Sequence, residues 1–213
     1  MRLMKRFRTV VPHFFMAALV LSVVAGCAST PSAPMQMGDY PVPAVDGNEA
    51  AKAVRQLEKY RFGDSRVPVA LLQEMVRESL QSPESRGLLA SMLGELLEGD
   101  ATLDGKRIAC RHLSLIGSQA QLPQLAPLLT DEDLSDFARY ALERIPGDAV
   151  DAALVNALAA TSGKTRIGII NSLGVRGASS ARPALRALRN DRDPATAEAA
   201  RAALRRGAPS SPG

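Results

Sequence analysis

The sequence has no tryptophan, and aromatic residues make up only 4% of its 213 positions, although 46% of the positions are hydrophobic. A core with so few rings must be built from leucine, alanine, isoleucine and valine. That composition favours packed helices over a β-sandwich, because sandwich strands are enriched in β-branched and aromatic residues. The charged fraction of 23% is that of an ordinary globular domain.

Cysteine and histidine are also scarce, with two of each in the whole chain. His13 falls in an N-terminal apolar segment, so His112 is the single histidine of the remaining sequence. Cys110 and His112 are two residues apart and would point in different directions from a helix, which excludes a nucleophile–base pair. We expect His112 to be a partly buried, hydrogen-bonded packing residue. Cys110 is expected to be a buried thiol, with an intermolecular disulfide as the open alternative.

Two further patterns indicate helix ends in preference to a metal site or a phosphate-binding loop. Asp131, Glu132 and Asp133 could hold a divalent ion, but acids at the head of a helix are favoured because they meet the positive end of its dipole. The segment Thr161–Thr165 lacks the preceding glycine and the strand of a phosphate-binding loop, so it indicates a helix N-terminus. The sequence therefore predicts no catalytic residue, no metal site and no cofactor.

The net charge of +4 comes from four basic residues within positions 1–26, which contain no acid. The other 22 basic and 22 acidic residues balance, so the charge does not favour a nucleic-acid partner. Residues 64–136 hold twelve acidic and six basic side chains, whereas residues 164–206 hold ten basic and three acidic ones. This uneven distribution would orient a charged partner, and the ordinary solvation of helix faces is the alternative.

A short motif recurs with a fixed spacing in the second half of the chain. Its leucine falls at Leu142, Leu173 and Leu204, 31 residues apart, and an earlier copy at Leu113 precedes them by 29 residues. Each copy ends in a break that contains glycine or proline, and both residues end helices. A second apolar run follows the first three breaks, with matching leucines at Leu125, Leu154 and Leu185. The pattern is typical of helix pairs that must stack on their neighbours to bury an apolar stripe.

The repeat units share further features. Small residues precede the leucine in an Ala-x-x-Ala-Leu-Gly type of pattern, a second helix begins with Pro183-Ala184-Leu185, and a turn has the sequence Asp191-Arg192-Asp193-Pro194. Over residues 48–207 these features resemble bacterial HEAT repeats. The resemblance implies an all-α fold, an α-solenoid of stacked antiparallel helix pairs. HEAT proteins are mostly scaffolds for diverse partners, so the resemblance implies a protein partner and carries no activity.

The N-terminal segment 1–26 has the layout of a secretory signal. A basic start is followed by an apolar run, Phe14–Gly26, which is shorter than the roughly 20 residues of a membrane span. The run ends in Val24-Ala25-Gly26-Cys27, which resembles the lipobox of bacterial lipoproteins. That resemblance implies that Cys27 becomes the lipidated N-terminus of a membrane-anchored protein. An uncleaved anchor and an ordinary signal are the alternatives. Because no aspartate follows the cysteine, we expect the outer membrane, on its periplasmic side.

The sequence predicts five parts. They are a lipoprotein signal peptide (1–26), a lipidated flexible tether rich in proline and serine (27–47), an N-terminal helical capping region (48–104), HEAT-like repeats (105–207) and a disordered tail (208–213). Within the capping region, apolar spacing predicts helices over 48–63, 67–80 and 82–99, and a loop over 100–105. The first of these helices would bury Phe62 beside Val54 and Leu57.

On the HEAT analogy, the second helix of each pair lines the concave side of the solenoid. The residues that would present a polar, basic face there are Asn156, Arg182, Arg186 and Arg189. We therefore expect a non-catalytic interaction scaffold or assembly module, held at the bacterial envelope by the lipid on Cys27. Relatives of the HEAT type include deoxyhypusine hydroxylases, whose iron-binding His-Glu pairs do not occur here. They also include bilin lyases, so an accessory lyase- or chaperone-like role is the alternative, although bilin attachment is a cytoplasmic reaction.

Overall fold

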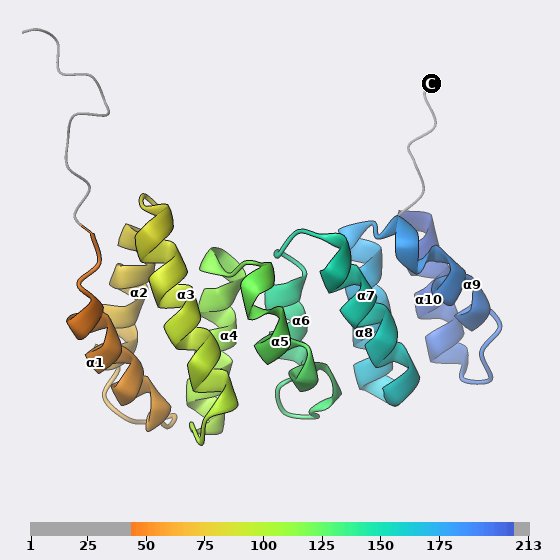
Figure 1. Cartoon of the computed structure of the whole chain (residues 1–213). Coiled ribbons are helices and arrows are strands. Elements are labelled where there is room, and N and C mark those ends of the chain that lie inside the picture. The colour runs from red at the N-terminus through yellow and green to blue at the C-terminus, as the bar shows by residue number, and fades with distance from the viewer. Residues whose placement is uncertain (1–43, 207–213) are drawn as a thin grey trace, which may run out of the picture. The chain divides into compact units, whose positions relative to one another are not determined.

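The computed structural model describes residues 44–206, and the regular secondary structure in that range is entirely helical (Figure 1). The all-α class that the sequence predicts is therefore confirmed. Four predicted features lie outside the described residues: the signal peptide, the lipidation site Cys27, most of the tether and the tail. Among the described helices, none combines the length and apolar character needed to cross a membrane.

The helices follow one another with short connections. The α-helices are α1 (Gly47–Glu58), α2 (Val67–Ser79), α3 (Pro83–Glu98), α4 (Leu103–Ile116), α5 (Leu122–Leu125), α6 (Ser135–Leu142), α7 (Asp148–Ala160), α8 (Gly163–Arg176), α9 (Arg182–Leu188) and α10 (Pro194–Arg206). Three 3-10 helices accompany them: η1 (Gln119–Gln121), η2 (Pro127–Thr130) and η3 (Ser179–Ala181).

Within residues 44–206 the helices form two layers (Figure 1). In one layer α2, α4, α6, α8 and α10 each contact the next helix of the series. The other layer holds the odd-numbered helices, in which α3 contacts both α1 and α5, and α7 contacts η2 and η3. The layers meet where α1 contacts α2, α3 contacts α4, α7 contacts α8 and α9 contacts α10.

The core lies between the layers and is mainly leucine and alanine. The repeat leucines Leu113, Leu142 and Leu173 are at most 1% exposed, and the last copy, Leu204, is half-buried. The matching leucines of the second runs are equally buried: Leu125, Leu154 and Leu185. The leucine periodicity therefore marks the buried side of both layers, as the sequence predicts.

Proline changes the shape of one predicted helix. The apolar run over 121–129 is divided into α5 and η2, because Pro127 lacks an N–H donor and its ring disturbs the preceding turn. Pro123 and Pro183 instead occupy first-turn positions of α5 and α9, where the N–H would have no helical partner. The break at Pro127 shortens this element of the odd-numbered layer.

Two arginines, Arg139 and Arg176, connect helices of the second half of the chain, and we call them the cross-helix arginines. The Arg176 side chain is only 8% exposed, pairs with Asp151 of α7 and donates hydrogen bonds of 2.6 Å to the carbonyls of Leu142 and Ile145. Arg139 of α6 donates to the Gly168 carbonyl of α8 at 3.1 Å. Both guanidinium groups therefore link neighbouring helical elements by donating to their backbone carbonyls.

Candidate functional site

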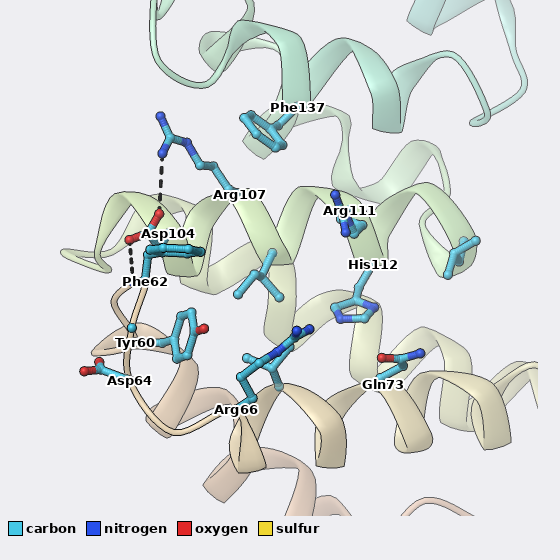
Figure 2. Close-up of a pocket in the computed structure, with 14 residues that line it drawn as sticks. Tyr60, Phe62, Asp64, Arg66, Gln73, Asp104, Arg107, Arg111, His112 and Phe137 are labelled. Carbon is cyan, nitrogen blue, oxygen red and sulfur yellow. Dashed lines mark hydrogen bonds and ion pairs between the residues drawn. The ribbon is translucent and has the colours of Figure 1, made fainter.

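A pocket of about 770 Å³ lies where α2, α4 and the connection between α1 and α2 meet (Figure 2). Phe137 of α6 completes its wall. We call it the α2–α4 pocket. Its lining combines apolar, aromatic and cationic side chains: Val69, Ile108, Leu115, Phe62, Phe137, Arg66, Arg107 and Arg111, with His112 beside them. The volume lies within the range of ligand-binding clefts.

The connection from α1 to α2 forms because α1 ends earlier than its apolar spacing predicts. The helix stops at Glu58, whose carbonyl accepts a hydrogen bond of 2.8 Å from the Thr102 N–H. The Thr102 hydroxyl then donates to the Tyr60 carbonyl. The predicted helix over 48–63 is therefore too long, and the predicted loop over 100–105 is wrong, because α4 starts at Leu103 with Thr102 as its N-cap.

Phe62 is the clearest consequence of this early helix end. Its side chain is 91% exposed, so the prediction that it belongs to a buried stripe is wrong. The backbone N–H of Phe62 donates to the Asp104 carboxylate at 2.9 Å, as Figure 2 shows. Gly63 follows with φ of 100°, a conformation that favours glycine, and turns the chain toward α2. The loop is thus held in place while the Phe62 side chain faces solvent.

The three arginines of the pocket differ in their partners. Arg107 pairs with Asp104 at 3.4 Å and with Asp133 at 3.8 Å, and its guanidinium lies 5.5 Å from the Phe137 ring centroid. Arg66 and Arg111 are exposed, and neither makes an ion pair or a side-chain hydrogen bond with any described residue. Two guanidinium groups of this pocket therefore have no acidic partner within the described part of the chain.

His112 is buried at the inner side of the pocket, with 6% of its surface exposed. Burial, reinforced by the charge of Arg111, lowers the pKa of His112 from 6.5 to about 4, so the imidazole is neutral at pH 7. Its Nδ1 atom has no hydrogen-bond partner among the described residues. Burial is as predicted, but the prediction of a hydrogen-bonded packing residue is wrong for this atom.

Cys110 is fully buried and is a free thiol. Burial raises the pKa of Cys110 to about 12, which keeps the sulfur protonated and unreactive near neutral pH. The prediction of a buried thiol is confirmed. Cys110 does not line the pocket, whereas His112 does, so the two side chains are not brought together for nucleophilic chemistry.

Among the acids at 131–133, Asp131 lies ahead of α6, as the sequence predicts. Asp131 accepts hydrogen bonds from the backbone N–H groups of Asp133 and Leu134, at 2.8 and 3.0 Å, just before α6 begins. Within residues 44–206, no group of three or more histidine, cysteine, aspartate or glutamate side chains could hold a metal ion. The segment Thr161–Thr165 leads into α8 at Gly163, as the sequence predicts.

The predicted partner-binding residues lie in the odd-numbered layer, away from the α2–α4 pocket lining. Asn156 is exposed on α7, and Arg186 of α9 and Arg189 just after it are also exposed. Arg182, at the start of α9, is half-buried. Their role in binding stays a prediction. The sequence did not predict Phe62, Arg66 or Arg111 as site residues. The one signal for them was the aromatic–glycine pair Phe62-Gly63, which lies close to basic residues.

Comparison of the chain with protein-family models, with curated proteins and with solved structures finds no match. The chemistry of the site therefore has to be argued from its own residues. The pocket offers two guanidinium groups without acidic partners, a neutral buried imidazole and exposed apolar side chains. These groups can bind an anion next to an apolar group, because arginine forks match carboxylate geometry and the ring and leucine surfaces gain from burial.

Proposed function

We propose that this protein is a non-catalytic protein-binding scaffold of HEAT-like helix pairs, anchored to the bacterial envelope by a lipid on Cys27. The observation that carries the proposal is the α2–α4 pocket, where Phe62 and Leu115 are 91% and 57% exposed beside arginines without acidic partners. Aromatic and arginine side chains are enriched at the centres of protein interfaces. Exposed apolar groups clustered around a cleft are typical of a docking surface.

The helix contacts support the HEAT-like part of the proposal. Each even-numbered helix contacts the next one, and the repeat leucines face the core between the layers. A stack of this kind buries an apolar stripe that a single helix pair would expose. The lipobox resemblance at residues 24–27 supports the anchor, and the missing aspartate after Cys27 supports the outer membrane.

The acids and nucleophiles near the pocket favour binding over catalysis. Asp104 already accepts from the Phe62 N–H and pairs with Arg107, and Asp64 accepts from the Arg61 N–H at 2.8 Å. A general base needs a free carboxylate or imidazole within reach of a nucleophile. The neutral His112 has no such nucleophile beside it among the lining side chains. Affinity would therefore come from shape and charge.

Crosslinking of the full chain in intact envelopes, followed by detergent extraction, tests the scaffold role. We compare the wild type with Phe62→Ala and with a matched control, Val175→Ala, because Val175 is 62% exposed on α8 and lies outside the pocket. One partner protein should be recovered with the wild type and the control, and about tenfold less with Phe62→Ala. Equal recovery with both variants would remove the pocket from the function.

Two further measurements test the anchor and the alternative role. The mass of the wild type should show acyl chains on Cys27 in place of residues 1–26, and Cys27→Ala should carry no acyl chains and keep residues 1–26. Turnover of a small molecule by the purified protein, lost on Cys110→Ser or His112→Ala, would instead favour the lyase-like alternative.

A further inference from the structure

The charges around the α2–α4 pocket leave a cationic excess at one place. Asp64 and Asp104 are both occupied by backbone N–H donors of the loop, and Asp104 also pairs with Arg107. Arg66, at the start of α2, and Arg111, on α4, have no such partner within residues 44–206. A guanidinium presents parallel N–H donors that match the two oxygens of a carboxylate.

His112 adds a second polar group that lacks a partner. Figure 2 shows its imidazole on the pocket side of α4, with Arg111 on the same helix and Arg66 approaching from the α2 side. The residue is 94% buried, and Nδ1 makes no hydrogen bond to any described atom. A buried polar atom without a partner destabilises the folded chain, but Nδ1 is enclosed by the protein, so a ligand in the pocket would meet the ring and not this atom. Gln73 lines the same cavity and can donate to such a ligand.

The apolar lining requires that the ligand carry more than a negative charge. Val69 and Ile108 line the pocket, and the largely exposed Phe62 and Leu115 lie at its edge. A free inorganic anion would leave these surfaces in water. Apolar side chains on both sides of the anionic group would cover them, and each side chain so buried contributes to affinity.

The number of free charges argues against a nucleic acid. A polyanion needs a run of cations along its backbone, whereas this site has two unpaired arginines with Asp64, Asp104 and Asp133 close by. Those acids would repel successive phosphates. A protein segment with one acidic side chain beside an apolar one matches both the charge and the surface.

We propose that the α2–α4 pocket binds an acidic side chain of a partner protein between Arg66 and Arg111, and packs apolar residues on the two sides of that acid against Phe62 at one end and Leu115 at the other. This inference rests on the proposed scaffold function and specifies its partner chemistry. It places the binding site on the even-numbered layer, and not at the predicted residues Asn156, Arg182, Arg186 and Arg189.

A peptide array tests the inference with the full chain in detergent. The array carries ten-residue peptides with every pairing of Asp or Glu with Leu, Ile, Val, Met, Phe or Tyr, and a matched set with Asn or Gln in place of the acid. Acidic–apolar peptides should bind the wild type, and their amide counterparts should bind about tenfold or more weakly. Inorganic phosphate and a single-stranded oligonucleotide should not compete at equal charge.

Charge-removing variants connect that binding to the pocket. Arg66→Gln with Arg111→Gln should weaken peptide binding about tenfold to a hundredfold, because two charge-assisted contacts are lost. Arg55→Gln with Arg192→Gln is the matched control, since these arginines are exposed and lie outside the pocket. Both pairs should keep the wild-type unfolding transition, because exposed arginines contribute little to stability.

Nuclear magnetic resonance of the His112 ring supplies a readout that does not depend on affinity. With residues 1–26 removed, His112 is the single histidine of the chain, so its signals are assigned directly. A bound acidic–apolar peptide should shift them, and an unchanged imidazole would contradict the placement.

Three results would overturn the inference: no preference for acidic peptides, equal binding by both arginine pairs, or stronger binding of the oligonucleotide. If the envelope partner is still recovered with the wild type and lost with Phe62→Ala, the scaffold function stands. Only the proposal that the pocket binds an acidic side chain then fails. If neither peptides nor a partner bind, both proposals fail.

Discussion

The helices α1–α4 and the helices α6–α10 share one plan but are held together by different interactions. Large apolar side chains dominate the first group, in which six leucines are at most 4% exposed in α1–α3: Leu57, Leu72, Leu89, Leu93, Leu96 and Leu97. In the second group α8 packs on α10 through small residues, so closely that a Cβ on Gly174 would lie 2.8 Å from the Ala203 Cα. Close approach also occurs in the first group, where a Cβ on Gly105 of α4 would lie closer still to the Leu57 carbonyl oxygen of α1. The two groups therefore differ in the size of the side chains at these contacts.

The arginines follow the same division. In α6–α10 the cross-helix arginines Arg139 and Arg176 are used to hold neighbouring helices, because their donors satisfy carbonyls of α8 and of the α6–α7 connection. In α1–α4 the leucines supply the packing, and Arg66 and Arg111 remain at a pocket without such partners. Arginine therefore holds helices together in α6–α10, whereas in α1–α4 two arginines are available for a ligand.

Replacing Arg176 should have the largest effect on stability. Arg176→Met leaves the Asp151 carboxylate, in a residue 8% exposed, without its cation and two carbonyls without donors. Breaking a buried ion pair on one side costs about 3–5 kcal/mol. Urea unfolding measures the loss. The control Arg201→Met removes a surface arginine that pairs with Glu198 at 3.5 Å and should cost under about 1 kcal/mol. Equal midpoints for both variants would refute the structural role of Arg176.

Acid should destabilise the α1–α4 region through His112. Because burial lowers the pKa of His112 to about 4, the unfolded chain takes up a proton more readily below pH 6.5. Stability is therefore complete above pH 6.5 and falls as the pH drops toward 4, by about 2 kcal/mol at pH 5. Unfolding in urea at pH 7 and pH 5 measures this change.

His112→Gln is the control for the pH experiment, since glutamine does not titrate in this range. The variant should lose that acid sensitivity between pH 6.5 and 5. The described carboxyl groups with a lowered pKa, such as Glu84 and Asp193, start from ordinary values of 4.5 and 3.8 and titrate below this window. A wild type as stable at pH 5 as at pH 7 would contradict the burial of a neutral imidazole.

Glycine substitutions should distinguish the close packing of α8 and α10 from that of α3. Gly174→Ala introduces a methyl group against Ala203, which costs about 1–3 kcal/mol and is partly offset by the roughly 1 kcal/mol gain in helix propensity. We expect a net loss of about 1 kcal/mol in thermal or urea unfolding. Gly87→Ala in α3 meets no atom within 4 Å and should stabilise the chain instead. Shifts of the same sign in both variants would contradict the comparison.

Phe62→Ala should have the smallest effect on folding. The side chain is 91% exposed, so its truncation removes little buried area and should change stability by less than about 0.5 kcal/mol. The same variant is expected to lose partner binding, which separates a ligand contact from a packing contact. A large drop in the unfolding midpoint would instead assign Phe62 to the core.

Much of the helical plan could be predicted from periodicity. The repeat leucines, the first-turn prolines and the capping role of Asp131 all depend on residues within a few positions of one another. Exposure on the helix faces was harder to predict, because Leu71 and Leu80 follow the apolar spacing of α2 but are 38% and 49% exposed. Whether an apolar position is covered depends on which neighbouring helix passes over it.

Local patterns in the sequence predict that the described chain is helical, where most helices begin, and that the repeat leucines face inward, because helix propensity, capping and periodicity act over short distances along the chain. The exposure of Phe62 and the pocket beside it depend instead on tertiary contacts. The end of α1 is held by Thr102 and Asp104, which bond to residues 42 positions earlier. Contacts at that separation leave no periodic pattern, so they appear only when α4 packs beside α1 and α2.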